Sequence, residues 1–383
     1  MIISSQLLQQ TADPTLPQNE RARLKCQLAK ELEDVGNYEA AREVMGELWS
    51  GVGERPILNR FDEATAAEVL LRAGVLTGWI GSIKQIEGAQ ETAKNLITES
   101  ITKFESLRDT GKVAEAQTEL GTCYWRQGAL GEARVILQQA LDWLPASSEA
   151  RAIALLRLAV VEGSAKRYND ALRIDNEAAP LFQKSTNHAY QGKFHNQFGF
   201  VLRNLAAAEK REDYIDRALI EYAAASIHFE QAGHTRYQAC VENNLGFLFG
   251  TIGKFPEAHW HLDRAQVLFT GMKDSVHTAQ VDDTRARVLL AEGRVGEAEK
   301  IVRCAVQVLE RGGEQSLLAE ALTTQGLVLA RMGSQRVARL TLQRAVEVAQ
   351  SAGDWEAAGL AALTVLEELA EHLPAHDLSA TYD

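Results

Sequence analysis

The sequence predicts an all-α solenoid of about eight helical hairpins, and a regular spacing of small residues is the main reason. Small residues begin the pattern at eight positions: Ala29, Gly74, Gly121, Ala159, Gly199, Gly246, Ala286 and Gly326. An alanine stands twelve or nineteen residues after each of them: Ala41, Ala93, Ala133, Ala171, Ala218, Ala258, Ala298 and Ala338. Small side chains are needed where two antiparallel helices touch and where each hairpin meets the next. The scarcity of aromatic residues (7%) and the lack of Ser/Gly-rich linkers favour one continuous array.

The elements follow in order along the chain. Residues 1–18 are expected to form a short helix and a turn, and residues 19–354 the array of about eight repeats. Residues 355–373 have helical periodicity but no partner hairpin, which predicts a C-terminal capping helix ending at Pro374. Its polar outer face would come from Glu367, Glu368 and Glu371. The tail at 374–383 resembles the start of a further segment, and whether the native chain continues past Asp383 stays open.

Two of the repeats are longer than the others. Successive starting positions differ by 45, 47, 38, 40, 47, 40 and 40 residues. In two repeats the small residue and its alanine are separated by nineteen residues instead of twelve, and the extra seven residues make about two helical turns. We expect these insertions to lengthen helices around Gly81–Thr92 and Ala206–Arg217, with a looped-out segment as the alternative.

The clearest copy of the repeat runs from Ala114 to Pro145 and contains six further marker residues: Leu120, Gly121, Tyr124, Gly128, Ala133 and Ala140. From about residue 20 to residue 350 the chain therefore resembles the tetratricopeptide repeat (TPR) family. The resemblance implies a right-handed superhelical solenoid that acts by binding. The consensus tryptophan is replaced by Gln117, and repeats near 40 residues are similar to those of kinesin light chains and bacterial MalT-like regulators.

Composition excludes several classes of function. The formal charge of −12 argues against general binding of nucleic acid or anionic membranes, because both need a basic surface. The chain has no run of 18 apolar residues, and its first residues lack the basic region of a signal peptide. The cysteines occupy separate repeats without C-x-x-C spacing, as is typical of a reducing compartment: Cys26, Cys123, Cys240 and Cys304. We expect a cytoplasmic protein.

No motif for catalysis or for a cofactor emerges. The run from Gly250 to Phe255 resembles a phosphate loop but lacks its spacer and its hydroxyl, and it falls where an inter-helix turn is expected. Six of the nine histidines lie between His188 and His261, without the i,i+4 spacing that paired metal ligands prefer. The sequence therefore predicts a non-enzymatic protein with neither a metal site nor a cofactor.

In this family the first helix of each hairpin lines the concave groove where partners bind. Counting the small residue as the eighth position, we expect the second, fifth, ninth, twelfth and thirteenth positions to face that groove. Early repeats would contribute Leu71, Val75, Gly78, Trp79, Thr118, Thr122, Trp125 and Arg126. Later repeats would contribute Lys193, Asn196, Phe200, Arg203, Asn204, Asn243, Phe247, Thr251, Gln280, Asp283 and Arg287.

Two repeats share the pattern N-x-x-G-F, beginning at Asn196 and Asn243. In a regular stack the two asparagines and the phenylalanines Phe200 and Phe247 would form a ladder on the groove wall. An asparagine carries both a donor and an acceptor, so it can hold a peptide bond whatever the neighbouring side chain. The resemblance to kinesin light chains extends this backbone-holding role to Asn244. The alternative is structural: the phenylalanines pack on adjacent helices and the asparagines bridge hairpins.

The sequence supports four hypotheses about function. The first is a scaffold that binds a protein or peptide. An acidic segment is favoured because Lys193, His195 and Arg203 make the inner surface of the fifth repeat basic, and Arg126, Arg203 and Arg287 could take carboxylates of the partner. The second is a ligand-sensing module of a bacterial transcriptional regulator. An enzyme using the histidine-rich middle and self-assembly through an open end are the others. The oligomeric state and the pathway stay open.

Overall fold

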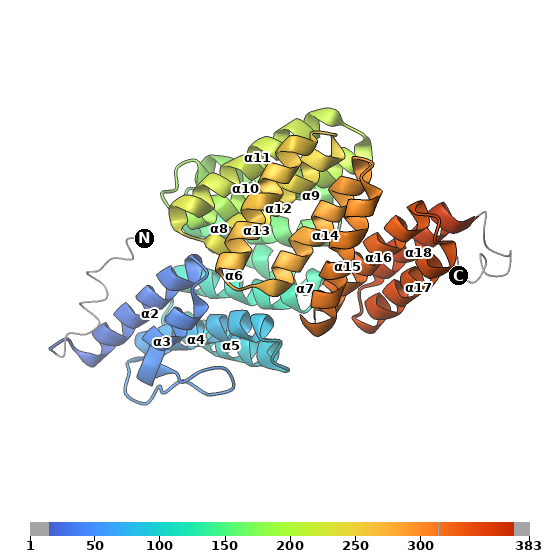
Figure 1. The fold of residues 1–383 in the computed structure, drawn as a ribbon. Helices are drawn as coiled ribbons and strands as arrows, with labels where there is room; N and C mark the ends of the chain where they lie inside the picture. Colours follow the sequence, from blue (N-terminus) through green and yellow to red (C-terminus); the bar gives the residue numbers. More distant parts are fainter. Residues whose placement is uncertain (1–14, 313, 371–383) are drawn as a thin grey trace. The chain divides into compact units, whose positions relative to one another are not determined.

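The computed structural model describes residues 15–312 and 314–370, and within them all regular structure is helical. The expected helix in residues 1–18 and the tail at 374–383 lie mostly or wholly outside the described residues. The helices form consecutive antiparallel pairs (Figure 1). The first five pairs are α2 (Gln18–Asp34) with α3 (Tyr38–Met45), α4 (Glu63–Ile83) with α5 (Ala89–Ser106), α6 (Thr110–Arg126) with α7 (Leu130–Trp143), α8 (Glu149–Ser164) with α9 (Tyr168–Phe182), and α10 (His188–Glu209) with α11 (Glu212–Ala232).

Three more pairs and a final helix complete the described chain. They are α12 (Thr235–Thr251) with α13 (Phe255–Gly271), α14 (Ser275–Ala291) with α15 (Val295–Gly312), α16 (Gln315–Arg331) with α17 (Gln335–Ser351), and α18 (Trp355–Leu369). The prediction of about eight hairpins and a capping helix is confirmed. The chain divides into two compact units, Met1–His234 and Thr235–Asp383, and each is described by itself.

The spacing of small residues has a direct structural cause. A Cβ added at Gly121 would lie 2.8 Å from Cγ of Leu137, and one at Gly326 would lie 2.5 Å from Cγ of Leu342. In both hairpins the partner comes sixteen residues later, on the second helix. In the longer fifth hairpin Gly199 instead faces Tyr222, twenty-three residues later, at 3.0 Å. The seven-residue insertion thus moves the partner by seven residues and keeps the contact.

The insertions are helical, as expected. Helices α10 and α11 have 22 and 21 residues, whereas α12 and α13 have 17 each. Helix α4 has 21 residues and α5 has 18. The looped-out alternative is wrong, because the extra residues extend both helices of a hairpin and leave only a short turn between them.

Two parts of the array depart from the regular pattern. Helix α3 has only eight residues, and the short 3-10 helix η1 (Gly46–Leu48) and a loop lead to α4. Trp49 begins this loop and is buried, with its Nε1 donating to the carbonyl oxygen of Glu54 at 3.0 Å. At the other end, α18 packs on α16 and α17 but exposes Trp355 and Leu363. These exposed apolar side chains make the outer face of α18 less polar than expected. Glu368, one of the glutamates expected on that face, is paired with Arg331 at 2.5 Å.

Helix starts are set by side chains that accept a backbone N–H of the first turn. Asp62, Asp109 and Asn187 do this at α4, α6 and α10. The turn inside the third hairpin needs a left-handed residue, which Gly128 supplies at φ 77°. These local signals position the first helices of the second, third and fifth hairpins, on which several candidate site residues lie.

Candidate functional site

The first helices of the first unit (α2, α4, α6, α8 and α10) form a surface that we call the first-helix face. The fifth and ninth positions were expected to line it, but this is wrong for the second and third repeats. Leu71 and Val75 belong to the hydrophobic core, and the hydroxyls of Thr118 and Thr122 are buried against carbonyl oxygens of their own helix. The stripe is rotated by about one position, because the sixth position, represented by Arg72, lines a cavity on this face.

That cavity has a volume of about 480 Å³ and lies between α2, α4 and α6. Charged side chains line most of it, and they pair across the helices. Lys112 lies 2.7 Å from Glu68 and 2.9 Å from Glu115, and Lys30 lies 2.5 Å from Glu115. At its inner end Arg72 forms a buried ion pair with Glu33. The cavity is therefore polar but close to neutral in charge.

The pairing changes the protonation equilibria of the cavity side chains. Burial acts to raise the pKa of Glu115, but the neighbouring cations Lys30 and Lys112 outweigh it and lower the pKa to about 2. Burial also opposes the charge of Arg72, yet its pKa is raised, because the carboxylate of Glu33 stabilises the guanidinium. Burial raises the pKa of the Cys26 thiol to about 12, so this cysteine is a neutral, unreactive part of the cavity wall.

Toward the C-terminal ends of α4 and α6, aromatic and cationic side chains stack. The ring of Tyr38 stacks on Trp79 with centroids 5.2 Å apart, and Cζ of Arg126 lies 3.6 Å from the centroid of the Trp79 ring system. Trp79 Nε1 and Arg126 Nη2 are buried without a hydrogen-bond partner among the described residues. Trp125 points elsewhere: its Nε1 donates to the hydroxyl of Ser164 on α8 at 2.8 Å. Trp125 and Arg126 were both predicted to face the groove, but only Arg126 has a buried nitrogen without a hydrogen-bond partner among the described residues.

The residues predicted on α10 have separate roles. Asn196 carries a buried Oδ1 without a hydrogen-bond partner among the described residues. Phe200 packs against Gly163 of α8 and meets Tyr168 edge-on at 6.3 Å, as the structural alternative had it. Arg203 lies over the Phe200 ring at 5.5 Å.

Two further residues of α10 are already bonded within the unit. Asn204 donates through Nδ2 to the carbonyl oxygen of Phe200 at 2.8 Å, one turn earlier in the same helix. Lys193, which was expected to make this surface basic, donates to the carbonyl oxygen of Asp34 at 3.1 Å. These bonds leave Asn196 as the residue of α10 best suited to a partner.

In the second unit, Asn243 of α12 repeats the environment of Asn196: its Oδ1 is buried and has no hydrogen-bond partner in the described part of the chain. Asn244 and Phe247 are half-buried on the same helix. Arg287 is engaged instead, by Asp283 at 2.8 Å and by Glu320 at 3.6 Å.

Arg287 also donates to the hydroxyl of Thr324 at 3.0 Å. Because this guanidinium already has carboxylate partners, it is less suited than Arg126 to take a partner's carboxylate. The ladder of asparagines and phenylalanines across the two units stays a prediction.

Residues far apart in the sequence also meet within the first unit. The turn after α2 contacts the fifth hairpin: Asn187 donates to Asp34 at 3.4 Å, and the His234 ring occupies the space where a Cβ on Gly36 would lie. Gly36 has φ 79°, so the turn needs both its backbone freedom and its missing side chain. This contact joins the first hairpin to the fifth.

Three of the histidines from the middle of the chain form a stack between α10 and α11. His228 lies between His188 and His195, with ring centroids 5.3 and 5.4 Å away, and His195 Nδ1 is 2.6 Å from Glu221. Burial, and then the two neighbouring rings, lower the pKa of His228. Within the described residues no group of three or more His, Cys, Asp or Glu side chains could hold a metal ion.

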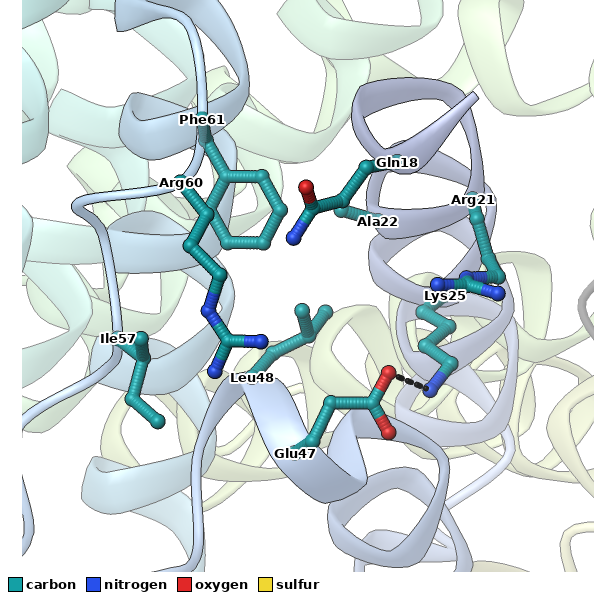
Figure 2. Close-up of a pocket in the computed structure, with 9 residues that line it drawn as sticks. All are labelled: Gln18, Arg21, Ala22, Lys25, Glu47, Leu48, Ile57, Arg60 and Phe61. Carbon is teal, nitrogen blue, oxygen red and sulfur yellow. Dashed lines mark hydrogen bonds and ion pairs between the residues drawn. The ribbon is translucent and has the colours of Figure 1, made fainter. Parts of the chain in front are cut away.

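A second cavity lies between α2 and the loop before α4 (Figure 2). Arg21, Lys25 and Arg60 approach it from two sides, and Lys25 pairs with Glu47 at 3.0 Å. Its volume of about 30 Å³ has room for little more than water. We therefore place the candidate site on the first-helix face.

Sequence reasoning missed part of this face. Tyr38, Lys30 and Lys112 were not named there, although Lys30 occupies the ninth position of the first repeat and Lys112 lies one turn before the second position of the third repeat. Tyr38 belongs to a second helix, which the groove model does not include. A simple signal was available for Lys112: Glu115 stands three residues later on the same helix, a spacing typical of ion pairs.

Comparison with known proteins agrees with the repeat architecture. Residues 277–351 match the model of the tetratricopeptide repeat family. These residues span α14 to α17, and consecutive helix pairs also form the rest of the described chain, although α3 is short. The matched part of the chain, α14 to α17, is thus built of tetratricopeptide repeats. No curated protein matches it by sequence. The narrower resemblance to kinesin light chains and MalT-like regulators stays a prediction.

Solved TPR-like structures share the fold at low sequence identity. Aspartyl phosphate phosphatase F from Bacillus subtilis has a TM-score of 0.59 at 11% identity, covering 90% of this chain and 87% of its own. Human IFIT1, solved as a dimer with m7Gppp-AAAA, has a TM-score of 0.57 at 14% identity, covering 90% and 76%. The Rap conjugation gene regulator of plasmid pLS20, in complex with the Phr* peptide, has a TM-score of 0.52 at 13% identity, covering 91% and 93%.

Among the described residues one helix, α4, is long and apolar enough to cross a membrane, and 78% of its most apolar window is buried inside the structure. Such burial is typical of a core helix, and α4 contributes Leu70, Ala73 and Leu76 to the first hydrophobic core cluster.

Proposed function

We propose that this TPR protein is a non-catalytic, cytoplasmic scaffold that binds an extended peptide segment of a partner protein, in signalling or regulation. One observation carries the proposal. The asparagines of the two N-x-x-G-F repeats, Asn196 and Asn243, each have a buried side-chain oxygen without a hydrogen-bond partner among the described residues.

An unsatisfied buried carbonyl costs about 1–3 kcal/mol, so two at the same repeat position are expensive unless a ligand satisfies them. A peptide backbone N–H is a suitable donor, and the asparagine Nδ2 can donate back to the peptide carbonyl. This arrangement holds a peptide bond independently of its side chains. Binding of a peptide by the similarly folded Rap regulator supports the choice of ligand.

The test is selection of peptides from a displayed random library on the purified chain, followed by affinity measurements on the variants Asn196→Ala and Asn243→Ala. We expect each substitution to weaken the selected peptides about tenfold, and the double variant more than either. Asn176→Ala is the matched control, because Asn176 is exposed on α9 and its amide bonds only to its own helix. Equal affinity in the double variant and in wild type would refute the proposed site.

A ligand-sensing module of a bacterial transcriptional regulator is the alternative setting for the same site. The Rap protein of plasmid pLS20 favours it, since that similarly folded protein is a gene regulator and was solved with a peptide. In this setting the peptide would change the relation between the repeats, whose contacts are mainly between neighbours. Hydrogen exchange with and without a selected peptide separates the two: a scaffold is protected only at the contact, whereas a sensor changes in distant hairpins as well.

A further inference from the structure

The cavity between α2, α4 and α6 contains a row of alternating charges that is open at both ends. Glu115 pairs with Lys30 at 2.5 Å and with Lys112 at 2.9 Å. Lys112 pairs in turn with Glu68 at 2.7 Å. We call these four residues the ion-pair row. Its inner members, Glu115 and Lys112, each have two partners of opposite charge. Its end members, Lys30 and Glu68, each have one among the described residues, so the row ends in an ammonium group and a carboxylate.

The inner members of the row stay ionised. Burial acts to raise the pKa of Glu115, but the two lysines lower it to about 2. Burial opposes the charge of Lys112, yet the carboxylates of Glu115 and Glu68 raise its pKa. Each inner charge is therefore neutralised within the row, and the unmatched charges lie at its ends. A partly desolvated charge is stabilised when a partner of opposite sign satisfies its remaining hydrogen-bonding capacity.

Both ends of the row are accessible from the cavity. The side chains of Lys30 and Glu68 keep 38% and 22% of their surface exposed, and both line the cavity of about 480 Å³. Small-molecule sites in proteins commonly have volumes of about 300–1,000 Å³. Only three contacts, none longer than 2.9 Å, separate the two ends. One small molecule can therefore enter the cavity and touch both ends.

Another part of the cavity wall is apolar. Phe104 and Leu107, at the C-terminal end of α5, and Ala64, in the first turn of α4, line it together with the charged side chains. Phe104 is buried in the hydrophobic core, but Leu107 is 42% exposed. Leu107 thus presents apolar surface beside a charged row, and covering that surface would be favourable. A matching ligand carries two opposite charges and an apolar substituent.

We infer that this cavity binds a free amino acid with an apolar side chain. The ligand carboxylate accepts from the ammonium of Lys30, and the ligand ammonium donates to Glu68. The row is then closed into a ring in which every charge has two partners. The apolar side chain of the ligand lies on Leu107. A residue inside a peptide has neither main-chain charge and a terminal residue has one, so a row that is open at both ends selects the free zwitterion.

This inference goes beyond the proposed function. The ligand is a small molecule instead of a peptide, and its site shares no residue with the asparagines that are proposed to hold a peptide bond. The site lies between the first helices of the first three hairpins, so a bound amino acid would join these helices by new ion pairs. Either site can therefore fail its test while the other stands.

The experiment is isothermal titration calorimetry of the whole chain at neutral pH and constant ionic strength. The probes are L-leucine, N-acetyl-L-leucine, L-leucinamide and glycine. We expect saturable binding of leucine. Acetylleucine lacks the ammonium and leucinamide lacks the carboxylate, so each should bind about tenfold more weakly, the effect of losing one charge-assisted hydrogen bond. Glycine should also bind more weakly than leucine, because it has no side chain to cover Leu107. This series uses the unmodified protein and does not depend on the folding of a variant.

Two variants assign the ends of the row. Lys30→Gln and Glu68→Gln should each weaken leucine about tenfold. In Lys30→Gln the advantage of leucine over leucinamide should disappear, and in Glu68→Gln its advantage over acetylleucine should disappear. A purely structural role of either residue would not produce this crossed pattern. Lys84→Gln is the control, because it breaks a 2.5 Å ion pair with Glu39 at the other end of α4 and should leave leucine affinity unchanged.

Several results would overturn the inference. One is the absence of saturable leucine binding at millimolar concentrations. Another is equal leucine affinity in wild type and in both row variants. If acetylleucine or leucinamide binds as tightly as leucine, the cavity holds the C-terminal or the N-terminal residue of a peptide, and the assignment to a free amino acid is wrong. Glycine binding as tightly as leucine would remove the apolar part of the assignment.

Discussion

Replacing Asp175 by valine should stabilise the first unit, and more so at higher pH. The small residue of each repeat is followed, after sixteen or twenty-three residues, by a buried residue of the second helix. In seven repeats that residue is apolar or aromatic: Met45, Ile97, Leu137, Tyr222, Leu262, Val302 and Leu342. In the fourth repeat it is Asp175, which is 0% exposed and whose two carboxylate oxygens have no hydrogen-bond partner in the described chain.

The magnitude follows from what the substitution removes and adds. An unsatisfied buried polar group costs about 1–3 kcal/mol, and burying an apolar side chain of valine size contributes about 1.5 kcal/mol or more. Some misfit is expected, so the net gain at neutral pH is about 2–4 kcal/mol. Valine is the matched choice because Val302 occupies this position in the seventh repeat, where the small residue is alanine, as it is in the fourth.

The pH dependence has a definite sign. Burial, and then the charge of Glu221, raise the pKa of Asp175 well above its usual value. The folded protein therefore holds a proton that the unfolded chain has released. Stability is complete below the unfolded pKa of about 3.9 and is lost as pH rises through the folded pKa, at up to about 1.4 kcal/mol per pH unit. Asp175→Val removes this loss, so its advantage over wild type grows with pH.

The assay is urea unfolding followed by hydrogen exchange of α9, repeated at several pH values between about 4 and about 8. Exchange of α9 gives the local free energy even if the array does not unfold in one step. Asp175→Asn is the control, since it keeps the shape but cannot ionise, and it should remove the pH dependence without the apolar gain. A gain that is equal at all pH values, or absent, would refute the reasoning about a buried, proton-binding carboxyl group.

Two further predictions concern packing and buried charge. Gly326→Ala should destabilise the second unit by about 1–3 kcal/mol because its Cβ would lie 2.5 Å from Cγ of Leu342, whereas Gly359→Ala, with no atom within 4 Å, should stabilise by up to about 1 kcal/mol. Urea unfolding of both variants checks the opposite signs, and a stabilising Gly326→Ala would contradict the packing argument. Glu33→Leu should cost about 3–5 kcal/mol because it leaves the Arg72 guanidinium buried and unpaired, and adding Arg72→Met should restore most of the loss. The same measurement decides this pair, and an equally unstable double variant would show that the ion pair itself stabilises the fold.

The fold could be predicted from the sequence because the helix contacts repeat. Gly121 and Gly326 each receive a leucine sixteen residues later, so the same steric requirement leaves the same trace in each repeat. Short α3 was not foreseen, because the chain from Gly46 to Asp62 replaces a helical turn with a loop that buries Trp49. Such a substitution preserves burial while breaking periodicity, and periodicity is what the sequence analysis reads.

The site could be predicted only in part, because the spacing of residues does not fix how a first helix is rotated about its own axis. A first helix contacts its own partner, the neighbouring hairpins and the first-helix face, so little of its circumference is clearly polar. Spacing places Leu71 and Arg72 on the same helix, but it does not decide which of them faces the groove. Arg126 and Asn196 were singled out by counting, and both are polar residues within five positions of the small residue of their repeat. Tyr38 could not be found by counting first-helix positions.

A repeat protein nevertheless offers an internal comparison that other folds lack. Every hairpin solves the same packing problem, so a residue that departs from its equivalents in the other repeats is not required by the fold. Asp175 departs from a position that is apolar or aromatic elsewhere, at a cost in stability. At the position equivalent to Arg126 the eighth repeat also has an arginine, Arg331, but Arg331 pairs with Glu368, whereas Arg126 has no ion-pair partner among the described residues. Because a solenoid could pack better with valine at one position and a neutral residue at the other, these two departures are the places where binding or proton uptake is expected to compensate for lost stability.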